Sequence, residues 1–291
     1  MLLAALLYLS GGITGTLVVR HPAVAAQLWP LAIRTQTVIV ACALGVIAGW
    51  RLHAFEQLAV PMGIELIMIA VLVVALATRG SASRGEAALW SWAATANTSF
   101  WTIPLATSFA GVNGAVIAVL ADRLGAARGA ATIHLLRADA PIPQRRRTAS
   151  VDQAPVAALV VGLALHAVGS APSWTDTLAG IFGPSLAFTG AALFFGSISH
   201  ELHRQVTVTR TDGVRSLGLL TVRVALAVPM LIWCWGSARA VVIVLAACSV
   251  PAFLPAQLSL LYGYRTGVVR AAARWGWPLG AIGLVLAVLA R

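Results

Sequence analysis

The sequence contains no lysine, and acidic residues are scarce. All 20 cationic side chains are arginines, nine residues are acidic, and charged residues make up only 10% of the 291 positions. Hydrophobic residues make up 59%, which is more apolar surface than one soluble core of this length could bury. This composition excludes an ordinary soluble enzyme or binding domain and predicts a membrane protein.

The excess of arginine gives the chain a formal net charge of +11. In a soluble protein such a charge would suggest a nucleic-acid partner. In a membrane protein the cytoplasmic loops collect basic residues, so the same charge reports the topology instead. We therefore expect a lipid bilayer as the environment of this chain and no nucleic-acid partner.

Cysteine is scarce as well. Cys42, Cys234 and Cys248 stand singly in apolar runs without CxxC spacing, and no histidine has the spacing to cysteine or acidic residues that a metal site needs. We expect these cysteines to pack as small apolar side chains, with no disulfide, no metal and no cofactor. Walker A, GxSxG and HExxH motifs are also absent, which argues against an ATPase and an intramembrane enzyme.

Long apolar runs recur along the whole chain, and each can cross a bilayer as a helix of about 17 to 25 residues. Ten spans can be drawn, at 2–19, 35–52, 58–78, 87–110, 113–136, 153–170, 175–199, 214–235, 238–262 and 268–290. The polar connection 137–152, a predicted cytoplasmic linker, separates a first five-helix repeat at 1–136 from a second at 153–291. The predicted fold class is an all-α polytopic membrane protein with ten transmembrane helices.

Arginine is unevenly distributed between the two sets of connections. The odd-numbered connections hold thirteen: Arg20, Arg34, Arg79, Arg84, Arg137, Arg145, Arg146, Arg147, Arg204, Arg210, Arg215, Arg265 and Arg270. The even-numbered connections and the termini hold three, which are Arg51, Arg239 and Arg291. Because basic loops stay in the cytoplasm, this predicts a multi-pass protein of the cell (plasma) membrane with both termini outside. Five spans per half then orient the halves oppositely, as in the inverted repeats of many secondary transporters.

Prolines interrupt the fourth and ninth spans, and in both a glycine-containing turn follows. The two stretches read "IPLATSFAGVNGAVIAVLADRLG" and "LPAQLSLLYGYRTGVVRAAARWG". A proline inside a helix frees backbone polar groups that hydrocarbon cannot satisfy, and paired broken helices are typical of substrate sites at the membrane midplane. A plain kink satisfied by nearby hydroxyls is the alternative. The candidate substrate-binding residues are Asn97, Thr98, Ser99, Thr102, Pro104, Ser249, Pro251, Pro255 and Gln257.

Two charged residues near the middle of spans are the candidate ion-coupling or gating residues, since such charges usually face a cavity or a partner. For Asp122 the sequence leaves open a proton or cation site, an ion pair with Arg223, and a structural salt bridge with Arg123. For Arg223 it leaves open a substrate carboxylate, a gating role and the pair with Asp122. Arg128 and Glu65 lie nearer span ends, where we expect solvent to reach them.

The stretch "NTSFWTIPLATSFAG" resembles the Asn-Thr-Gly-x-x-Gly-x-Pro motif of the auxin efflux carrier family of membrane transporters, and "AVIAVLAD" resembles the acidic helix that follows it. The similarity continues in "GPSLAFTGAALFFGSIS", "VRVALAVP" and "VPAFLPAQLSLLYGY". It implies two inverted five-helix repeats in which broken helices four and nine cross near the membrane centre. It also implies secondary transport of organic anions such as carboxylates.

The resemblance assigns roles to positions of this sequence. It implies that Asn97 and Pro104 lie on the first crossover, Pro251 and Pro255 on the second, Asp122 at the acidic position of helix five and Arg223 at the basic position of helix eight. Ser99 and Thr102 depart from the family, which has glycine at both places. These two side chains change the size and chemistry expected of the pocket.

The function expected from these features is that of an auxin-efflux-carrier-type permease, which exports small organic anions by alternating access. A sodium and bile acid symporter-like uptake carrier is the alternative within transporters, and a non-transporting membrane sensor of the same fold is the alternative outside them. The sequence leaves open coupling to H⁺ or Na⁺ and assembly as a homodimer.

Overall fold

The computed structural model describes residues 2–52, 56–141, 154–203, 207–250, 255, 262–265 and 267–291, and within these ranges it contains helices and no strand. The helices before residue 142 are α1 (Leu2–Val19), α2 (Pro22–Arg34), the π-helix η1 (Thr35–Val40), α3 (Ala41–Trp50), α4 (Glu56–Ala77), α5 (Arg84–Ala94), the π-helix η2 (Thr98–Thr102) and α6 (Ile103–Ala138). Those after it are α7 (Ala154–Val168), α8 (Trp174–His203), α9 (Arg210–Cys234), α10 (Ala238–Ala247) and α12 (Gly267–Leu289).

Four helical stretches are long and apolar enough to cross a membrane, and they are Gln57–Ala77, Thr98–Ala138, Arg210–Cys234 and Gly267–Leu289. One face of α4 exposes large apolar side chains at helical spacing, namely Met62, Leu66, Ile69 and Val73. Such a face suits contact with lipid, because in water a continuous apolar stripe would be unfavourable. The described part of the chain is therefore helical and has the helices of a membrane protein.

The stretch Thr98–Ala138 consists of two helices joined by a turn. Gly111 within α6 has a φ of 61° and a ψ of −151°, which is a conformation that residues with a Cβ rarely adopt. The sequence analysis separates the fourth and fifth spans at 110–113, so the turn coincides with that boundary.

Three predicted spans differ from the observed helices, and in one of them, 238–262, α10 ends at Ala247. Most of the predicted span 35–52 belongs to a longer helical run from Pro22 to Trp50. A proline fits at the start of this run because a first-turn residue needs no backbone donor. The interruption expected at Pro104 lies earlier, at residues 95–97, and Pro104 occupies the first turn of α6. A proline can start a helix as well as break one, and its position alone does not distinguish the two cases.

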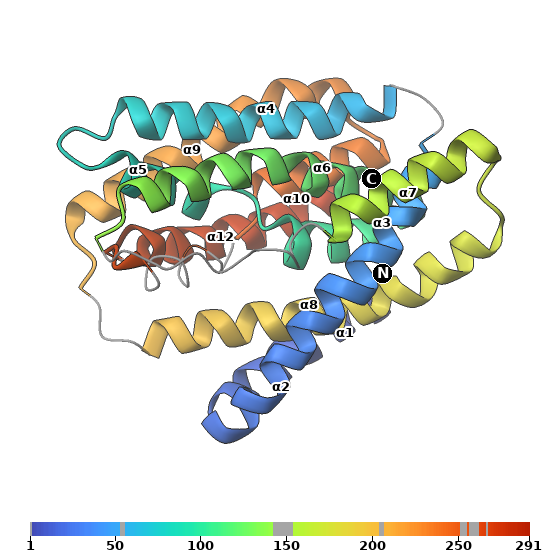
Figure 1. The fold of residues 1–291 in the computed structure, drawn as a ribbon, viewed down its shortest axis with the longest axis horizontal. Helices are drawn as coiled ribbons and strands as arrows, with labels where there is room; N and C mark the ends of the chain where they lie inside the picture. Colours follow the sequence, from blue (N-terminus) through green and yellow to red (C-terminus); the bar gives the residue numbers. More distant parts are fainter. Residues whose placement is uncertain are drawn as a thin grey trace.

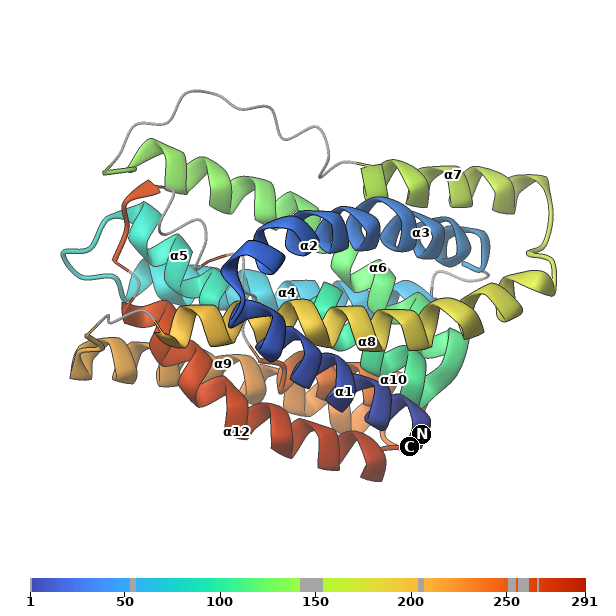
Figure 2. The same cartoon turned by 90° about the horizontal axis from the view of Figure 1, so that it is seen from below.

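Helix α1 packs along α8, and α3 packs along α7 (Figure 2). Glycines permit both contacts, since a Cβ on Gly15 would collide with the backbone of Ala192, and a Cβ on Gly162 would collide with the backbone of Val46. Gly49 of α3 also abuts the α7 backbone. In a bilayer, close backbone approach of this kind replaces the hydrophobic effect as the force that joins helices.

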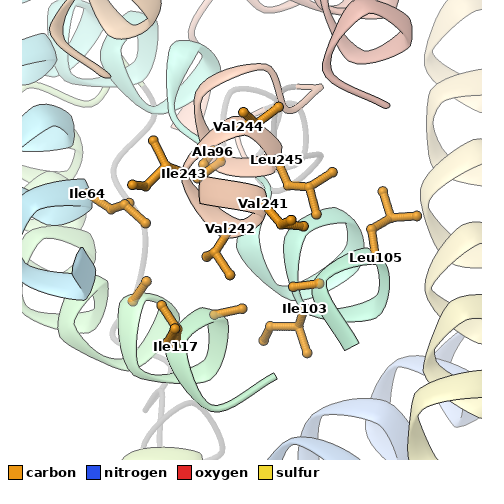
Figure 3. Packing of buried hydrophobic residues seen from close by; sticks show 14 of the residues in the cluster. Ile64, Ala96, Ile103, Leu105, Ile117, Val241, Val242, Ile243, Val244 and Leu245 are labelled. Carbon is orange, nitrogen blue, oxygen red and sulfur yellow. The ribbon is translucent and has the colours of Figure 1, made fainter. Parts of the chain in front are cut away.

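The other long helices pack on one another in a second body, in which α4, α6, α9 and α12 surround α5 and α10 (Figure 1). Every residue at 240–247 in α10 is buried, which is the pattern of a helix enclosed by protein on all sides. Figure 3 shows α10 side chains packed among Ile64 of α4 and Ile103 and Ile117 of α6. A short helix thus ends inside the protein, where its terminal carbonyl groups cannot reach water.

Candidate functional site at the two half-helix ends

Helices α5 and α10 are half-helices, and a serine side chain caps the first turn of each. The Ser83 hydroxyl accepts a hydrogen bond from the amide of Glu86 at 3.0 Å, and the Ser237 hydroxyl accepts one from the amide of Ala240 at 3.4 Å. Serine at this position satisfies an amide that the first turn leaves without a partner. Both helices end in buried backbone, so their last carbonyl oxygens also need donors.

The donors come from one side chain, Arg223 of α9. Its Nη1 donates to the carbonyl oxygen of Ala94 at 2.6 Å, its Nε to that of Ala247 at 2.9 Å, and its Nη2 to that of Ser249 at 2.6 Å. The Arg223 side chain is fully buried. A helix carboxyl end carries roughly half a negative charge, so one guanidinium approximately balances the ends of α5 and α10 together.

Asn97 connects the two interruptions and starts the next helix. Its backbone amide donates a hydrogen bond to the Ser249 hydroxyl at 3.1 Å. Its side-chain oxygen accepts one from the backbone amide of Phe100 at 3.2 Å. The Asn97 carbonyl oxygen accepts from the amides of Trp101 and Thr102, both at 3.1 Å. Asn97 and Ser249 are both buried, so the connection between α5 and η2 meets the end of α10 in a buried polar contact, which we call the crossover.

Asp122 is held by η2 and by its own neighbour. The hydroxyls of Thr98 and Ser99 both donate to Asp122 Oδ1, the second at 2.8 Å, and Arg123 Nη2 lies 3.0 Å from Asp122 Oδ2. The sequence left open whether Asp122 pairs with Arg123 or with Arg223. The structure contains the salt bridge with Arg123, and the guanidinium of Arg223 instead donates to backbone carbonyl oxygens. The Ser99 hydroxyl is therefore used for a contact within the protein.

Several buried donors have no hydrogen-bond partner in the part of the chain that the structure describes, and three of them belong to η2, to its cap or to a residue packed against it. They are the side-chain amide of Asn97 and the hydroxyls of Thr102 and Tyr8, which are 2%, 0% and 5% exposed as residues. The Tyr8 ring lies edge-on to the Trp101 ring, with 5.8 Å between centroids. Sequence reasoning missed Tyr8, although a tyrosine within the apolar first span was a visible signal.

Other candidates fall in different places. Pro255 is buried and helical, whereas Pro251 and Gln257 lie outside the described residues. Glu65 of α4 forms a salt bridge with Arg128 of α6 at 2.7 Å, and both side chains are largely buried. The expected solvation of this pair at span ends is therefore wrong, because each charge finds its partner on the neighbouring helix.

No family model matches this chain, and no curated protein sequence matches it either. The similarity to auxin efflux carriers rests on the motifs quoted above.

Proposed function

We propose that this protein is a secondary transporter, an auxin-efflux-carrier-type permease that exports small organic anions by alternating access. The observation that carries the proposal is the meeting of two half-helix ends at a buried polar contact, where Arg223 and the Asn97–Ser249 hydrogen bond satisfy the broken backbone. Irregular backbone at membrane depth is costly, and transporters use it to present helix ends to a solute.

The pairing of helices supports ten spans arranged as two inverted five-span repeats. If α1 corresponds to α7 and the run α2–α3 to α8, then the α1–α8 contact has its counterpart in the α3–α7 contact. The contacts of α4 with α5 and α6 similarly match those of α9 with α10 and α12. A two-fold relation between the halves would produce this reciprocal pattern.

The distribution of arginine over the two ends of the helices supports the proposed orientation. In Figure 1 the turn between α4 and α5 and the start of α9 lie at one end, and the turn between α7 and α8 lies at the other. The first end carries Arg79, Arg84, Arg210 and Arg215. Helix α1 begins toward the second end and α12 finishes toward it, which favours a cytoplasmic first end and external termini in a plasma-membrane protein.

Flux into proteoliposomes tests the proposal directly. We expect wild-type protein to move at least one member of a panel of radiolabelled acetate, benzoate, succinate and malate faster than empty vesicles do. Asn97→Ala should abolish most of this flux, because it removes the side-chain oxygen that caps η2 and the buried side-chain amide beside it, while the backbone bond to Ser249 stays in place. Asn113→Ala, at an exposed asparagine after the Gly111 turn, is the matched control and should retain wild-type flux.

Ion gradients distinguish the export carrier from the uptake carrier. Flux that depends on a proton gradient or on the membrane potential agrees with the proposal, whereas flux that requires a sodium gradient favours the bile acid symporter-like alternative. A wild-type protein that moves no carboxylate above empty vesicles contradicts the proposed function.

A further inference from the structure

The short connection before α12 carries two buried tyrosines that are bound to the end of α6. The Tyr264 hydroxyl donates to the Leu136 carbonyl oxygen at 2.8 Å, and Arg137 Nε donates to the Tyr262 hydroxyl at 3.0 Å. Gly263 between the tyrosines is exposed and has a φ of 77°, a backbone conformation that favours glycine. The chain therefore turns at Gly263 while both neighbouring side chains stay attached to α6.

The start of α5 belongs to the same contact. The backbone amide of Gly85 donates to Asp139 Oδ2 at 3.0 Å, and Asp139 is the residue that ends α6. A Cβ on Gly85 would collide with the Tyr264 hydroxyl, so the tyrosine fits here only because this position of α5 has no side chain. The contact thus joins a segment from the second half of the chain to two helices of the first half.

The two tyrosines also cover the side of α5 that leads to the crossover. They pack with Leu89 and Ala93 of α5 in one buried cluster, and the next residue, Ala94, contributes a carbonyl oxygen that Arg223 binds. Figure 1 shows the start of α5, the end of α6 and the start of α12 at the same end of the molecule, which the proposed orientation places in the cytoplasm. The tyrosines therefore lie between the cytoplasm and the crossover.

The turn at the corresponding place in the first half is open. Gly111 also has a positive φ, of 61°, but a Cβ there would meet no atom of the described chain within 4 Å, and Asn113 beside it is exposed. The proposed topology places this turn outside the cell. Inverted repeats that alternate their access close one side while they open the other, so the contrast between the turns fits a protein that is closed toward the cytoplasm.

We propose that Tyr262 and Tyr264 form the cytoplasmic gate of this transporter, which is closed in this structure and opens when their contacts with the end of α6 break. The proposal rests on the proposed function. Opening exposes the last carbonyl groups of a helix at the membrane surface, where water can satisfy them. Breaking these bonds is therefore much less costly than breaking the buried bonds of Arg223.

The accessibility of Cys248 tests the gate without any solute. Cys248 follows α10 at the crossover and is buried. In a protein that carries Cys42→Ala and Cys234→Ala, a charged methanethiosulfonate is applied to the cytoplasmic side of inverted vesicles, and mass spectrometry follows the modification. Tyr264→Phe should accelerate the reaction about fivefold, the effect of losing one hydrogen bond that holds the gate closed. Gly85→Ala should accelerate it as well, because its Cβ displaces the tyrosine.

Two controls separate opening of the gate from general loosening. Gly213→Ala, in the first turn of α9 where a Cβ would meet no atom of the described chain, should leave the rate unchanged. A protein that keeps only Cys234, which is buried at the opposite end of α9, should react at the same rate with and without the gate variants. Equal acceleration at Cys234 and Cys248 overturns the gate.

Carboxylate flux into the corresponding proteoliposomes separates the gate from transport. Wild-type rates of Cys248 modification in both gate variants overturn the gate, and flux by the wild type then leaves the proposed function standing. Faster modification of Cys248 alone supports the gate. If the wild type in that case moves no carboxylate, the proposed function is contradicted while the opening at the two tyrosines stands.

Discussion

The glycine-packed helix pairs and the crossover have similar apolar surroundings but are held together by different forces. In the α1–α8 and α3–α7 pairs, Gly15, Gly49 and Gly162 let one backbone approach another without an intervening side chain. At the crossover, Arg223 and Ser249 instead supply the hydrogen bonds that two broken helices lack. The helix pairs are therefore stabilised by complementary shape, and the crossover is stabilised by hydrogen bonds to backbone polar groups.

This difference predicts different costs of mutation. An added side chain in a helix pair forces two backbones apart, and lipid can fill the space that opens. A side chain removed at the crossover leaves a carbonyl or amide group that neither lipid nor water can reach, which is more expensive in an apolar medium. The largest single loss of stability should therefore come from the crossover, and the following changes test this.

Arg223→Met should have the largest effect. It leaves the carbonyl oxygens of Ala94, Ala247 and Ser249 without their donor, and we expect a loss of ~3–5 kcal/mol in the free energy of unfolding. Reversible unfolding in mixed micelles measures it. Arg215→Met on the same helix, at a side chain that stacks on Trp90, is the control. Equal stabilities of the two variants would contradict the role of Arg223 at the helix ends.

Gly15→Val should have an intermediate effect. Its side chain would collide with the Ala192 backbone, and overpacking of this kind costs about 1–3 kcal/mol. Gly180→Ala on α8 is the control, because that position faces open space and alanine favours the helix by up to about 1 kcal/mol. The same unfolding assay compares them, and a Gly15→Val protein as stable as wild type would mean that the α1–α8 contact does not depend on shape.

Ser249→Ala should cost somewhat less than the loss of Arg223. It removes the acceptor of the Asn97 amide, and one buried amide without a partner costs about 1–2 kcal/mol. Ser185→Ala is the control, because that exposed hydroxyl bonds only to the Ile181 carbonyl of its own helix. Amide hydrogen exchange at Asn97 should accelerate in the first variant alone, and unchanged exchange would argue against the bond between the two interruptions.

Ser99→Ala should have the smallest effect. Asp122 keeps its contacts with Thr98 and Arg123 after this change, so the loss should be no more than about 1 kcal/mol. Thermal unfolding beside Ser108→Ala, which removes a hydroxyl bonded within its own helix, provides the comparison. A loss larger than that of Ser249→Ala would show that Asp122, and not the linked interruptions, dominates the stability of the crossover.

The sequence predicted the class of the fold well, but it was less successful in identifying the residue at which a helix is interrupted. Runs of apolar residues identified a helical membrane protein, and the glycine turn at Gly111 lies where the sequence separates two spans. The interruption was assigned to Pro104, but it lies at residues 95–97, because a proline also fits the first turn of a helix. Asn97, a residue that caps helices, was the better marker of the break.

The sequence could indicate which polar side chains belong to the site, but not which groups they contact. Asn97 and Ser249 were chosen because they lie near prolines that free backbone polar groups, and Asp122 because a charge is costly in an apolar span; the structure gives each of them polar contacts. The partners of Arg223 are backbone carbonyls, which every residue has, so no sequence pattern marks them. Tyr8 was overlooked because its distance along the chain from the crossover conceals its contact with Trp101.

Composition by itself determined the solvent of this protein, since 59% hydrophobic residues and 10% charged residues suit a bilayer and require helices that satisfy their own backbone. Tertiary structure alone decided which charges meet. It paired Glu65 of α4 with Arg128 of α6 and aimed Arg223 at the ends of two half-helices, because those ends come together only when α9 packs against both α5 and α10. Hydrogen bonds depend on distances of a few tenths of an ångström, and only the packed helices establish distances on that scale.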